Sequence, residues 1–334
     1  MNSAENMILP SRNSGMGTAL IKTRLLFASD FHGNETVWRK FLNSAKIFDC
    51  NVLLCGGDMT GKVMVPIIRR AEGGYTATLM KKRYRINEED LQEFKKRVRT
   101  YSYIPYVCSE EEHRRLSEHP EEVERVFEKI ERETLKDWCD LVPQKLPKGT
   151  KLIMNTGNDD KLALDEVLRN HPAIVYADEE VVNIDERHEM ACFSWSNPTP
   201  WDSPREAPEE ELEIRIENVL ANVRNMPDAI FAFHVPPYDS QIDKAPRLDE
   251  NLRVVVEGGR TITIPVGSKA VRKAIERHQP LIGLHGHIHE SPGVYKIGRT
   301  VCVNPGSEYA EGLLKAYIIE FEDGRIARLQ RIEG

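Results

Sequence analysis

The sequence has no apolar run close to the ~20 residues that a transmembrane helix needs, so we expect no membrane span. Its first 20 residues also lack the basic start and the apolar stretch of a signal peptide, and we expect residues 1–20 to form a disordered tail. None of the six cysteines belongs to a Cys-x-x-Cys pair. Several cysteines lie inside apolar runs, where a reduced thiol behaves as a small hydrophobe. These features predict a protein of the reducing cytoplasm.

An excess of basic residues is missing as well. The chain has 46 Lys and Arg against 53 Asp and Glu, a net charge of -7, which argues against a general attraction to nucleic acid or anionic membranes. Basic residues do gather between Lys81 and Arg99, but acidic residues at 88–93 interrupt them. We therefore interpret this segment as a solvated helical face, and nucleic acid is not an expected partner.

The regular elements predict a mixed α/β fold. A chain of 334 residues with 40% hydrophobic residues can form one large core with an insertion. Leu25–Ser29 and Asn51–Cys55 are predicted as buried strands, and Thr36–Phe48 between them has helical periodicity. This β-α-β order implies a parallel strand pair with a right-handed crossover. Strand-rich stretches follow later, so we expect two packed sheets with helices outside.

The segment from Lys62 to Thr150 differs from its surroundings. It begins with a predicted hairpin over 63–85, and charged, helix-like stretches follow at 87–99 and 120–141. Since a structureless loop of that length would be implausible in a compact domain, we predict a cap-like insertion at about 62–150. The remainder of residues 21–334 is predicted to form a single domain.

Five apolar, strand-like runs each end in residues that suit metal binding. In chain order these motifs are Asp30-Phe31-His32, Gly56-Gly57-Asp58, Gly157-Asn158-Asp159, His234 and Gly286-His287-Ile288-His289. They offer four imidazoles, two carboxylates and one amide oxygen, at the strand ends where open α/β sheets place their sites. Seven ligands are too many for one metal and suit two. A metal pair about 3.5–4 Å apart is suited to hydrolysing phosphate esters.

Each motif also has a plainer interpretation when it stands alone. Asp30 could be a loop aspartate, Gly56-Gly57-Asp58 an ordinary turn, and Asn158 a helix N-cap. A lone histidine such as His234 is more often packed or solvated than bound to a metal. Only Gly286-His287-x-His289 favours chelation by itself, because its two imidazoles lie two residues apart after a glycine. The combination of the five motifs therefore carries the prediction.

The order and placement of the motifs resemble the calcineurin-like metallophosphoesterases, whose pattern is D-x-H, G-G-D, G-N-x-[DE], H and G-H-x-H. The resemblance covers Leu25 to about Ile332 apart from the insertion, and it looks closest to the small bacterial and archaeal phosphodiesterase-like members. It implies a four-layer αββα sandwich, with two mixed sheets flanked by helices. It also implies a first metal held by Asp30, His32, Asp58 and His289, and a second held by Asp58 as bridge, Asn158, His234 and His287.

The resemblance implies a hydrolase of phosphoric esters, a phosphodiesterase that uses hydroxide held between two divalent ions. Manganese, iron, zinc or cobalt would suit the ligands, and a small phosphate ester is the expected substrate. One position departs from the family pattern, because Asp159 stands where many members have a histidine. Asp159 is thus a candidate general acid, with metal-bound water as an equal candidate. An ionised Asp159 would also repel monoester dianions more than diester monoanions, which predicts a preference for diesters.

Two alternatives from other functional classes are a non-catalytic metal-binding scaffold of the same fold and a nuclease. A scaffold would be expected to lose ligands, whereas all seven are present, and a nuclease would need a basic track. Asn197 and Trp201 follow a predicted strand and are candidate substrate contacts. Trp201 could stack on a base or sugar, although a packed loop tryptophan is the plainer interpretation.

Overall fold

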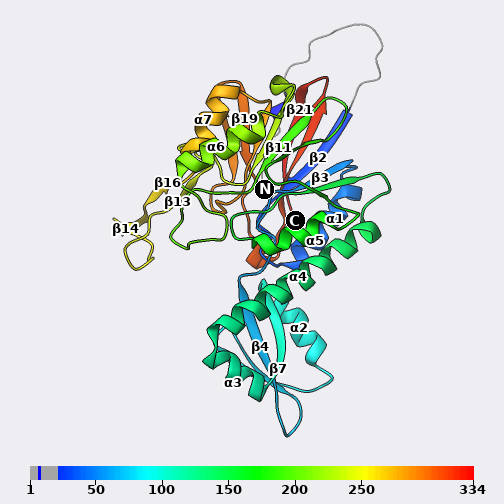
Figure 1. The fold of residues 1–334 in the computed structure, drawn as a ribbon, viewed down its shortest axis with the longest axis vertical. Coiled ribbons are helices and arrows are strands. Elements are labelled where there is room, and N and C mark those ends of the chain that lie inside the picture. Colours follow the sequence, from blue (N-terminus) through cyan, green and yellow to red (C-terminus); the bar gives the residue numbers. More distant parts are fainter. Residues whose placement is uncertain (1–6, 9–21) are drawn as a thin grey trace.

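A computed structural model describes residues 7–8 and 22–334 (Figure 1). The predicted disordered tail at 1–20 lies outside these residues, except for Met7–Ile8, which form strand β1. Within the described part of the chain the fold contains seven α-helices and five β-sheets, which confirms the predicted mixed α/β class. Among the helices of these residues, none has the combined length and apolar character that crossing a lipid bilayer requires.

The largest sheet has seven strands and contains the predicted β-α-β unit. Its spatial order is β1, β21 (Arg325–Glu333), β20 (Lys315–Glu322), β2 (Lys22–Ala28), β3 (Val52–Cys55), β8 (Lys151–Met154) and β9 (Val175–Tyr176). Strands β2, β3, β8 and β9 run parallel, whereas β20 is antiparallel to β2. Helix α1 (Glu35–Ile47) connects β2 to β3 and is capped by Asn34, whose side chain accepts a hydrogen bond from the Val37 amide. The short helix α5 (Asp165–Arg169) precedes β9.

A second sheet has six strands. Its order is β10 (Glu180–Asn183), β11 (Glu189–Phe193), β12 (Ile230–Phe233), β17 (Ile282–Leu284), β19 (Thr300–Asn304) and β18 (Gly293–Ile297). The four central strands are parallel, and the two edge strands are antiparallel to their neighbours. Helices α6 (Glu209–Leu220) and α7 (Lys269–His278) precede β12 and β17.

Three hydrophobic clusters cover the faces of the two large sheets. One cluster combines side chains of both sheets, such as Phe27 and Ile230. A second joins the seven-stranded sheet to α1 and α4 (Pro120–Lys145), where Trp38 stacks on Trp138 with ring centroids 5.3 Å apart. A third packs α6 and α7 onto the six-stranded sheet. Side chains of β2 alternate between the first two clusters, as expected for a strand buried on both faces.

Between β3 and β8 the chain forms a separate lobe, at the bottom of Figure 1. The lobe holds a four-stranded sheet in the order β6 (Lys82–Ile86), β5 (Tyr75–Leu79), β4 (Val63–Arg69) and β7 (Tyr103–Ser109). Helix α2 (Leu91–Thr100) buries Phe94 and Val98 against one face of this sheet. Helix α3 (Glu110–Glu118) packs near β4, β7 and α4, and α3 and the start of α4 complete the lobe.

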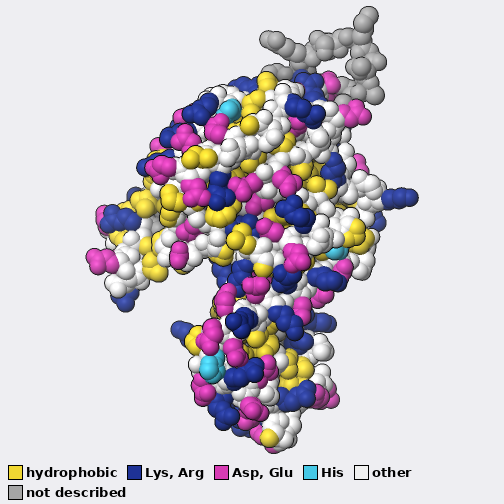
Figure 2. All heavy atoms as spheres, viewed as in Figure 1, with side chains coloured by type: hydrophobic (Ala, Val, Ile, Leu, Met, Phe, Trp, Pro, Cys, Tyr) yellow, Lys and Arg dark blue, Asp and Glu magenta, His cyan; other side chains and the backbone are white. Residues whose placement is uncertain are grey.

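Helix α4 begins in the lobe and ends in the main core, where Leu135, Trp138, Cys139 and Val142 are buried. The predicted 62–150 insertion therefore includes residues that complete the core. At the left of Figure 1, residues 244–265 form an arm, in which strands β13 (Lys244–Pro246) and β16 (Thr263–Pro265) pair and lead into β14 (Val256–Glu257) and β15 (Arg260–Thr261). Figure 2 shows a hollow between this arm and the lobe, with basic and acidic side chains interspersed over the visible face.

Candidate metal centre

The five predicted motifs lie at the carboxyl ends of strands from both large sheets. Asp30 and His32 follow β2, Asp58 follows β3, Asn158 follows β8, His234 follows β12, and His287 and His289 follow β17. Backbone hydrogen bonds join the loops, including Asp30 N to Gly57 O at 3.0 Å and Gly286 N to His234 O at 2.8 Å. These bonds bring segments from distant parts of the sequence into one site.

Four of the predicted ligands have a left-handed backbone conformation. The φ angles are 62° at Asp30, 41° at His32, 51° at Asp58 and 66° at His287. Such a conformation costs a non-glycine residue on the order of 1–3 kcal/mol and persists only where the surroundings fix it. Residues in such conformations cluster at functional sites. The backbone angles therefore indicate a functional site at the same position as the sequence motifs do.

Two glycines permit the close approach of the ligand loops. A Cβ atom at Gly157 would overlap the Asp58 carboxylate and the His234 ring, and a Cβ at Gly286 would overlap the Ser29 hydroxyl and the Asp30 carboxylate. The absence of a side chain at both positions thus leaves room for the functional groups.

The candidate ligands form two adjacent groups, and a third group overlaps both by joining His32 and Asp58 to Asp159. One contains Asp30, His32 and His289, and the other contains Asp58, His234 and His287; within each group the ligand atoms lie within 4.8 Å of one another. In the first group His32 Nε2 lies 3.0 Å from His289 Nε2, which is 3.4 Å from Asp30 Oδ1. The two groups could therefore each hold one ion.

Two further contacts complete the second group. The amide oxygen of Asn158 lies 3.1 Å from His234 Nε2. The other ring nitrogen of His234, Nδ1, lies 2.9 Å from Gly56 O. Since a carbonyl can only accept, Nδ1 carries a proton. Nε2 faces two further acceptors, the oxygens of Asn158 and Asp58. Burial alone would lower the pKa of His234, but the Asp58 carboxylate raises it to about 10, so without a metal Nε2 is protonated too, and a bound cation would take the place of that proton.

Asp58, a member of the second group, also borders the first. Its Oδ2 atom is 3.7 Å from His32 Nε2 in the first group and 3.4 Å from His234 Nε2 in the second. Its Oδ1 atom accepts a hydrogen bond of 3.0 Å from the Asp159 backbone amide, which fixes the carboxylate. One carboxylate oxygen is thus within reach of ligands from both groups.

Burial and mutual repulsion shift the protonation of this cluster. Burial, reinforced by the Asp159 carboxylate, raises the pKa of Asp58 to about 7. Burial also lowers the pKa of His287 to about 3, and the neighbouring His234 adds to this effect. Nδ1 of His32 is buried and has no hydrogen-bond partner. Buried imidazoles and carboxylates that converge in this way match the nitrogen and oxygen ligands of borderline divalent ions, so the residues fit a metal site.

Asp160, the acidic residue that ends the G-N-x-[DE] pattern, supports the site from behind. Its carboxylate accepts hydrogen bonds from the backbone amides of Met59 at 3.0 Å, Thr60 at 3.2 Å and Gly157 at 2.9 Å. These bonds join the loop after β3 to the loop after β8. The second aspartate of Gly157-Asn158-Asp159-Asp160 was the available signal in the sequence.

Asp159 lies beside the metal groups but is engaged on both oxygens. Oδ2 forms an ion pair with Lys62 Nζ, and Oδ1 accepts hydrogen bonds from Ser203 Oγ at 2.9 Å and Asn158 Nδ2 at 3.3 Å. Burial alone would raise the pKa of Asp159, but Lys62, His32 and these hydrogen bonds lower it to about 2. The carboxylate is ionised at neutral pH, which gives no support to the predicted role as general acid.

Three residues near the site were missed by sequence reasoning. Lys62 and Ser203 contact Asp159, and the Tyr309 ring lies 4.6 Å from the His32 ring and 5.6 Å from the His289 ring, measured between centroids. None belongs to a recognisable motif, since each approaches the site only through the tertiary fold.

The predicted substrate contacts lie on the loop that carries Ser203. Asn197 Nδ2 donates to Val266 O at 3.2 Å, and its Oδ1 atom is buried without a partner. Trp201 is 65% exposed and therefore not a packed loop residue. In the described part of the chain, no hydrogen bond or ion pair joins Asn197 or Trp201 to the candidate ligands, and their role remains a prediction.

Comparison with known proteins identifies relatives of the fold. No family model matches the chain. An uncharacterised protein of Methanocaldococcus jannaschii is 38% identical over 112 residues, which cover 33% of this chain and only 44% of that protein. One crystal structure is similar at a TM-score of 0.54, with 16% identity over 90% of this chain and 95% of the other.

Two further structures have lower scores. The protein TT1561 of Thermus thermophilus has a TM-score of 0.50 and 15% identity, over 93% of this chain and 98% of the other. An archaeal phosphodiesterase has a TM-score of 0.38 and 12% identity, over 93% of this chain and 100% of the other. At such identities the structures with scores of 0.54 and 0.50 show a shared fold and nothing about activity. The third structure is too dissimilar to show either.

Proposed function

We propose that this protein is a metal-dependent phosphoesterase of the calcineurin-like type, acting on small phosphodiesters. The observation that carries the proposal is the position of Asp58 Oδ2, 3.7 Å from His32 Nε2 and 3.4 Å from His234 Nε2. A carboxylate shared by two ligand groups suits a pair of ions about 3.5–4 Å apart, which is a common arrangement for displacement at phosphorus.

We also propose a four-layer αββα arrangement for the two large sheets. The support is the division of the hydrophobic side chains into three clusters. One cluster lies between the sheets, one lies under α1 and α4, and one lies under α6 and α7. This order would place the carboxyl ends of the parallel strands of both sheets at one edge.

The residues that would hold the ions follow from the two groups. Asp30, His32, Asp58 and His289 would hold one, and Asp58, Asn158, His234 and His287 would hold the other. Two divalent ions, for which manganese, iron, zinc and cobalt are the candidates, would polarise the phosphoryl oxygens and lower the pKa of a water molecule.

The chain itself supplies orientation and charge around that chemistry. Gly56 O fixes the tautomer of His234, and the backbone amide of His287 donates to both oxygens of Asp30 at 3.0 and 3.1 Å. Lys62, whose side chain is 50% exposed, provides a cation at the rim beside Asp159. By pairing with Asp159, this ammonium group offsets a carboxylate charge that would otherwise repel a phosphate anion.

The proposal is tested with protein reconstituted with each metal and then desalted. We expect elemental analysis to approach two ions per chain, and hydrolysis of diesters in a screen that also contains monoesters, cyclic nucleotides and DNA. Asp58→Asn should reduce hydrolysis at least about a hundredfold, because losing a residue that merely orients a metal ligand already costs roughly 10–100-fold. His278→Ala, which removes a contact to Glu217 on the outer helices, serves as the control.

Two other results would replace the proposal. Stoichiometric metal without hydrolysis of any ester would indicate a scaffold, and a strong preference for DNA would indicate a nuclease. We further propose a cytoplasmic location, for which the support is that all six cysteines are buried and unpaired.

A further inference from the structure

Arg205 is a buried cation that belongs neither to the sequence motifs nor to the ligand groups. It lies on the loop between β11 and α6 and is 1% exposed. Its guanidinium forms ion pairs with the carboxylates of Asp178, at 2.9 Å, and Asp165. An arginine is almost never fully buried unless it is paired, and a buried ion pair seldom adds net stability over an apolar substitute. Stability alone therefore does not account for this residue.

The same guanidinium binds the backbone of the loop after β8. Arg205 Nε donates to Asp160 O at 2.9 Å, and a terminal nitrogen donates to Lys161 O at 3.4 Å. The backbone amide of Arg205 donates to Asn158 O at 3.1 Å. Three hydrogen bonds from one residue thus hold the stretch 158–161, which carries the candidate ligand Asn158.

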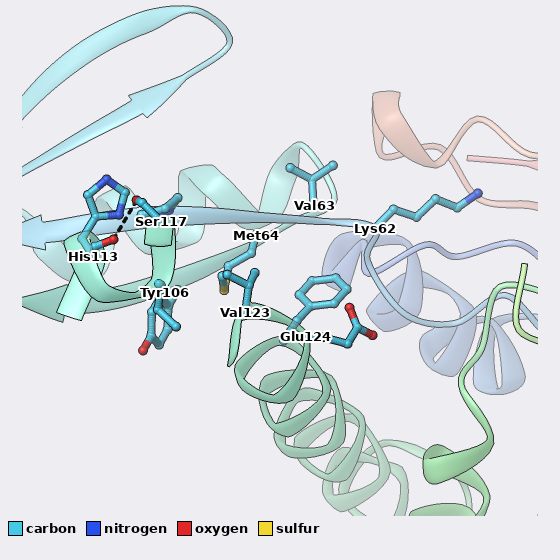
Figure 3. Close-up of a pocket in the computed structure, with 11 residues that line it drawn as sticks. Lys62, Val63, Met64, Tyr106, His113, Ser117, Val123 and Glu124 are labelled. Atoms are coloured by element: carbon cyan, nitrogen blue, oxygen red, sulfur yellow. Dashed lines mark hydrogen bonds between the residues drawn. The ribbon is translucent and has the colours of Figure 1, made fainter. Parts of the chain in front are cut away.

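Other contacts to this stretch act through the ends of long side chains. Lys62 pairs with Asp159, and Lys161 pairs with Glu124 at 2.6 Å and with the buried Glu131 at 3.0 Å. Lys62 and Glu124 come from the lobe, where both line a cavity and the Lys62 side chain extends away from the other lining residues (Figure 3). These two side chains are half exposed or more, and ion pairs at the surface contribute little. The guanidinium, by contrast, is buried and binds the backbone itself.

Asn158 depends on the placement of this stretch. Its amide oxygen has no net charge, so it contributes to metal binding only where its surroundings hold it at the correct position. Its amide nitrogen donates to Asp159 Oδ1 at 3.3 Å, which is a weak contact within the same stretch. The backbone that Arg205 holds therefore decides where the amide oxygen lies.

We propose that Arg205 is a positioning residue for the metal centre: it holds the backbone that presents Asn158, and thereby sets the affinity of the ion in the second ligand group. The inference rests on the proposed function, from which it takes the two ions. Among the described contacts, none joins Arg205 to the three residues of the first group. The ion of the first group should therefore depend much less on this arginine.

The variants change the guanidinium or one of its partners. Arg205→Lys keeps the charge, but an ammonium group cannot reproduce the planar fork that binds two carboxylates and two carbonyls. Asp165→Asn neutralises one partner whose side chain is 27% exposed, and it carries the test alone where the lysine variant does not fold. Melting temperatures show which variants are folded.

Arg299→Lys is the matched control. Arg299 also donates to two backbone carbonyls, those of Gln279 and Pro227, at 2.7 Å each. These residues precede β17 and β12, whereas the candidate ligands follow the same strands. The control thus removes a similar set of hydrogen bonds at the opposite ends of the strands.

Calorimetric titration of the metal-free protein with Mn²⁺ measures both ions without a substrate. We expect two ions in the wild type and in Arg299→Lys. Arg205→Lys should lose about 10–100-fold in affinity for one ion, which is the usual loss when a residue behind a metal ligand is changed. Asp165→Asn should lose about threefold for the same ion, since a neutral acceptor holds a guanidinium less strongly than a carboxylate does.

Two further measurements separate positioning from general damage to the fold. Asn158→Ala should weaken the same ion, and adding Arg205→Lys to it should cause little further loss, because the arginine acts through Asn158. Saturating Mn²⁺ should restore the wild-type kcat of Arg205→Lys on a diester, because the substitution lowers only the occupancy of the site.

Equal weakening of both ions, additive losses in the double variant, or unchanged affinities in the folded variants would overturn the role of Arg205, even in a protein that hydrolyses diesters. The expected loss of one ion in a protein that hydrolyses no ester would overturn the proposed function and leave the role of Arg205. A wild type that takes up no Mn²⁺ would overturn both.

Discussion

Replacing Lys62 with methionine should reveal the charge of Asp159. In the wild type the two groups form an ion pair, so the rim beside the metal centre is close to neutral. The sequence alone suggested that an ionised Asp159 repels monoesters, but Lys62 offsets most of that repulsion. We therefore expect only a weak preference for diesters in the wild type and a clear one in Lys62→Met.

The size of the effect follows from the extra charge of a monoester. At a separation of about 5 Å and an effective dielectric constant of about 20, one unit of charge against Asp159 is worth on the order of 3 kcal/mol. Because half of the Lys62 side chain is exposed, solvent screening reduces this, and we expect about 1.4 kcal/mol, or tenfold. The monoester kcat/KM should thus fall about tenfold more than the diester value.

The assay compares a monoester and a diester with the same p-nitrophenyl leaving group at saturating Mn²⁺. The double variant Lys62→Met with Asp159→Asn should restore the wild-type ratio, because no uncompensated carboxylate remains. Lys129→Met, which removes a cation from the exposed face of α4 and a 3.9 Å contact to Glu133, is the control. A ratio that Lys62→Met leaves unchanged would refute the electrostatic argument.

Three further outcomes are expected. Chelation should lower the free energy of unfolding of the metal-loaded wild type by about 2.7 kcal/mol for each ion present at a hundredfold excess over its Kd, and Asp58→Ala should lose most of this difference; identical melting curves with and without chelator would contradict a metal centre. Gly157→Ala should abolish metal retention in elemental analysis because its methyl group would overlap Asp58 and His234, whereas Gly293→Ala, whose Cβ would meet no atom closer than 3.4 Å, should retain metal. Burial alone would raise the pKa of Asp185, but hydrogen bonds from His188 and Thr23 lower it below its usual value of 3.8. The hydrogen-bonded Asp185 carboxylate should add about 2 kcal/mol to the free energy of unfolding above pH 4. This stabilisation should decline below pH 4, so denaturant curves of Asp185→Asn and wild type should converge in acid and differ at pH 7.

The parts of the fold that were predictable from sequence have strong local signals. The run Leu25–Ala28 is continuously apolar and is followed by Ser29 and Asp30, and Thr36–Phe48 repeats its apolar residues with helical spacing. These signals located β2 and α1 within a few residues. They also placed the ligand motifs at strand ends, because the strands themselves were recognisable.

The lobe was harder to predict because its signals are weak or long-range. The stretch Tyr75–Arg85 appeared as one arm of a hairpin, but it contains two strands, β5 and β6, which turn at Met80 and Lys81 with positive φ angles. Neither residue is a usual turn former. Strand β7 was not predicted, since among the residues that the structure describes it pairs with β4, about forty residues earlier in the chain. In the same way the ion pair of Lys62 with Asp159 joins residues nearly one hundred positions apart, and no local sequence pattern predicts it.

The course of α4 has a consequence for how the protein unfolds. This helix belongs at one end to the lobe and at the other to the core, where Trp138 stacks on Trp38 of α1. Losing the core would therefore remove one wall of the lobe, and melting the lobe would fray a helix that the core requires. We expect the two parts to unfold in a single cooperative transition, unlike independent domains joined by a linker. Two of the four tryptophans form this contact between α4 and α1. The intrinsic fluorescence of the unmodified protein therefore reports on the loss of that contact when the protein unfolds.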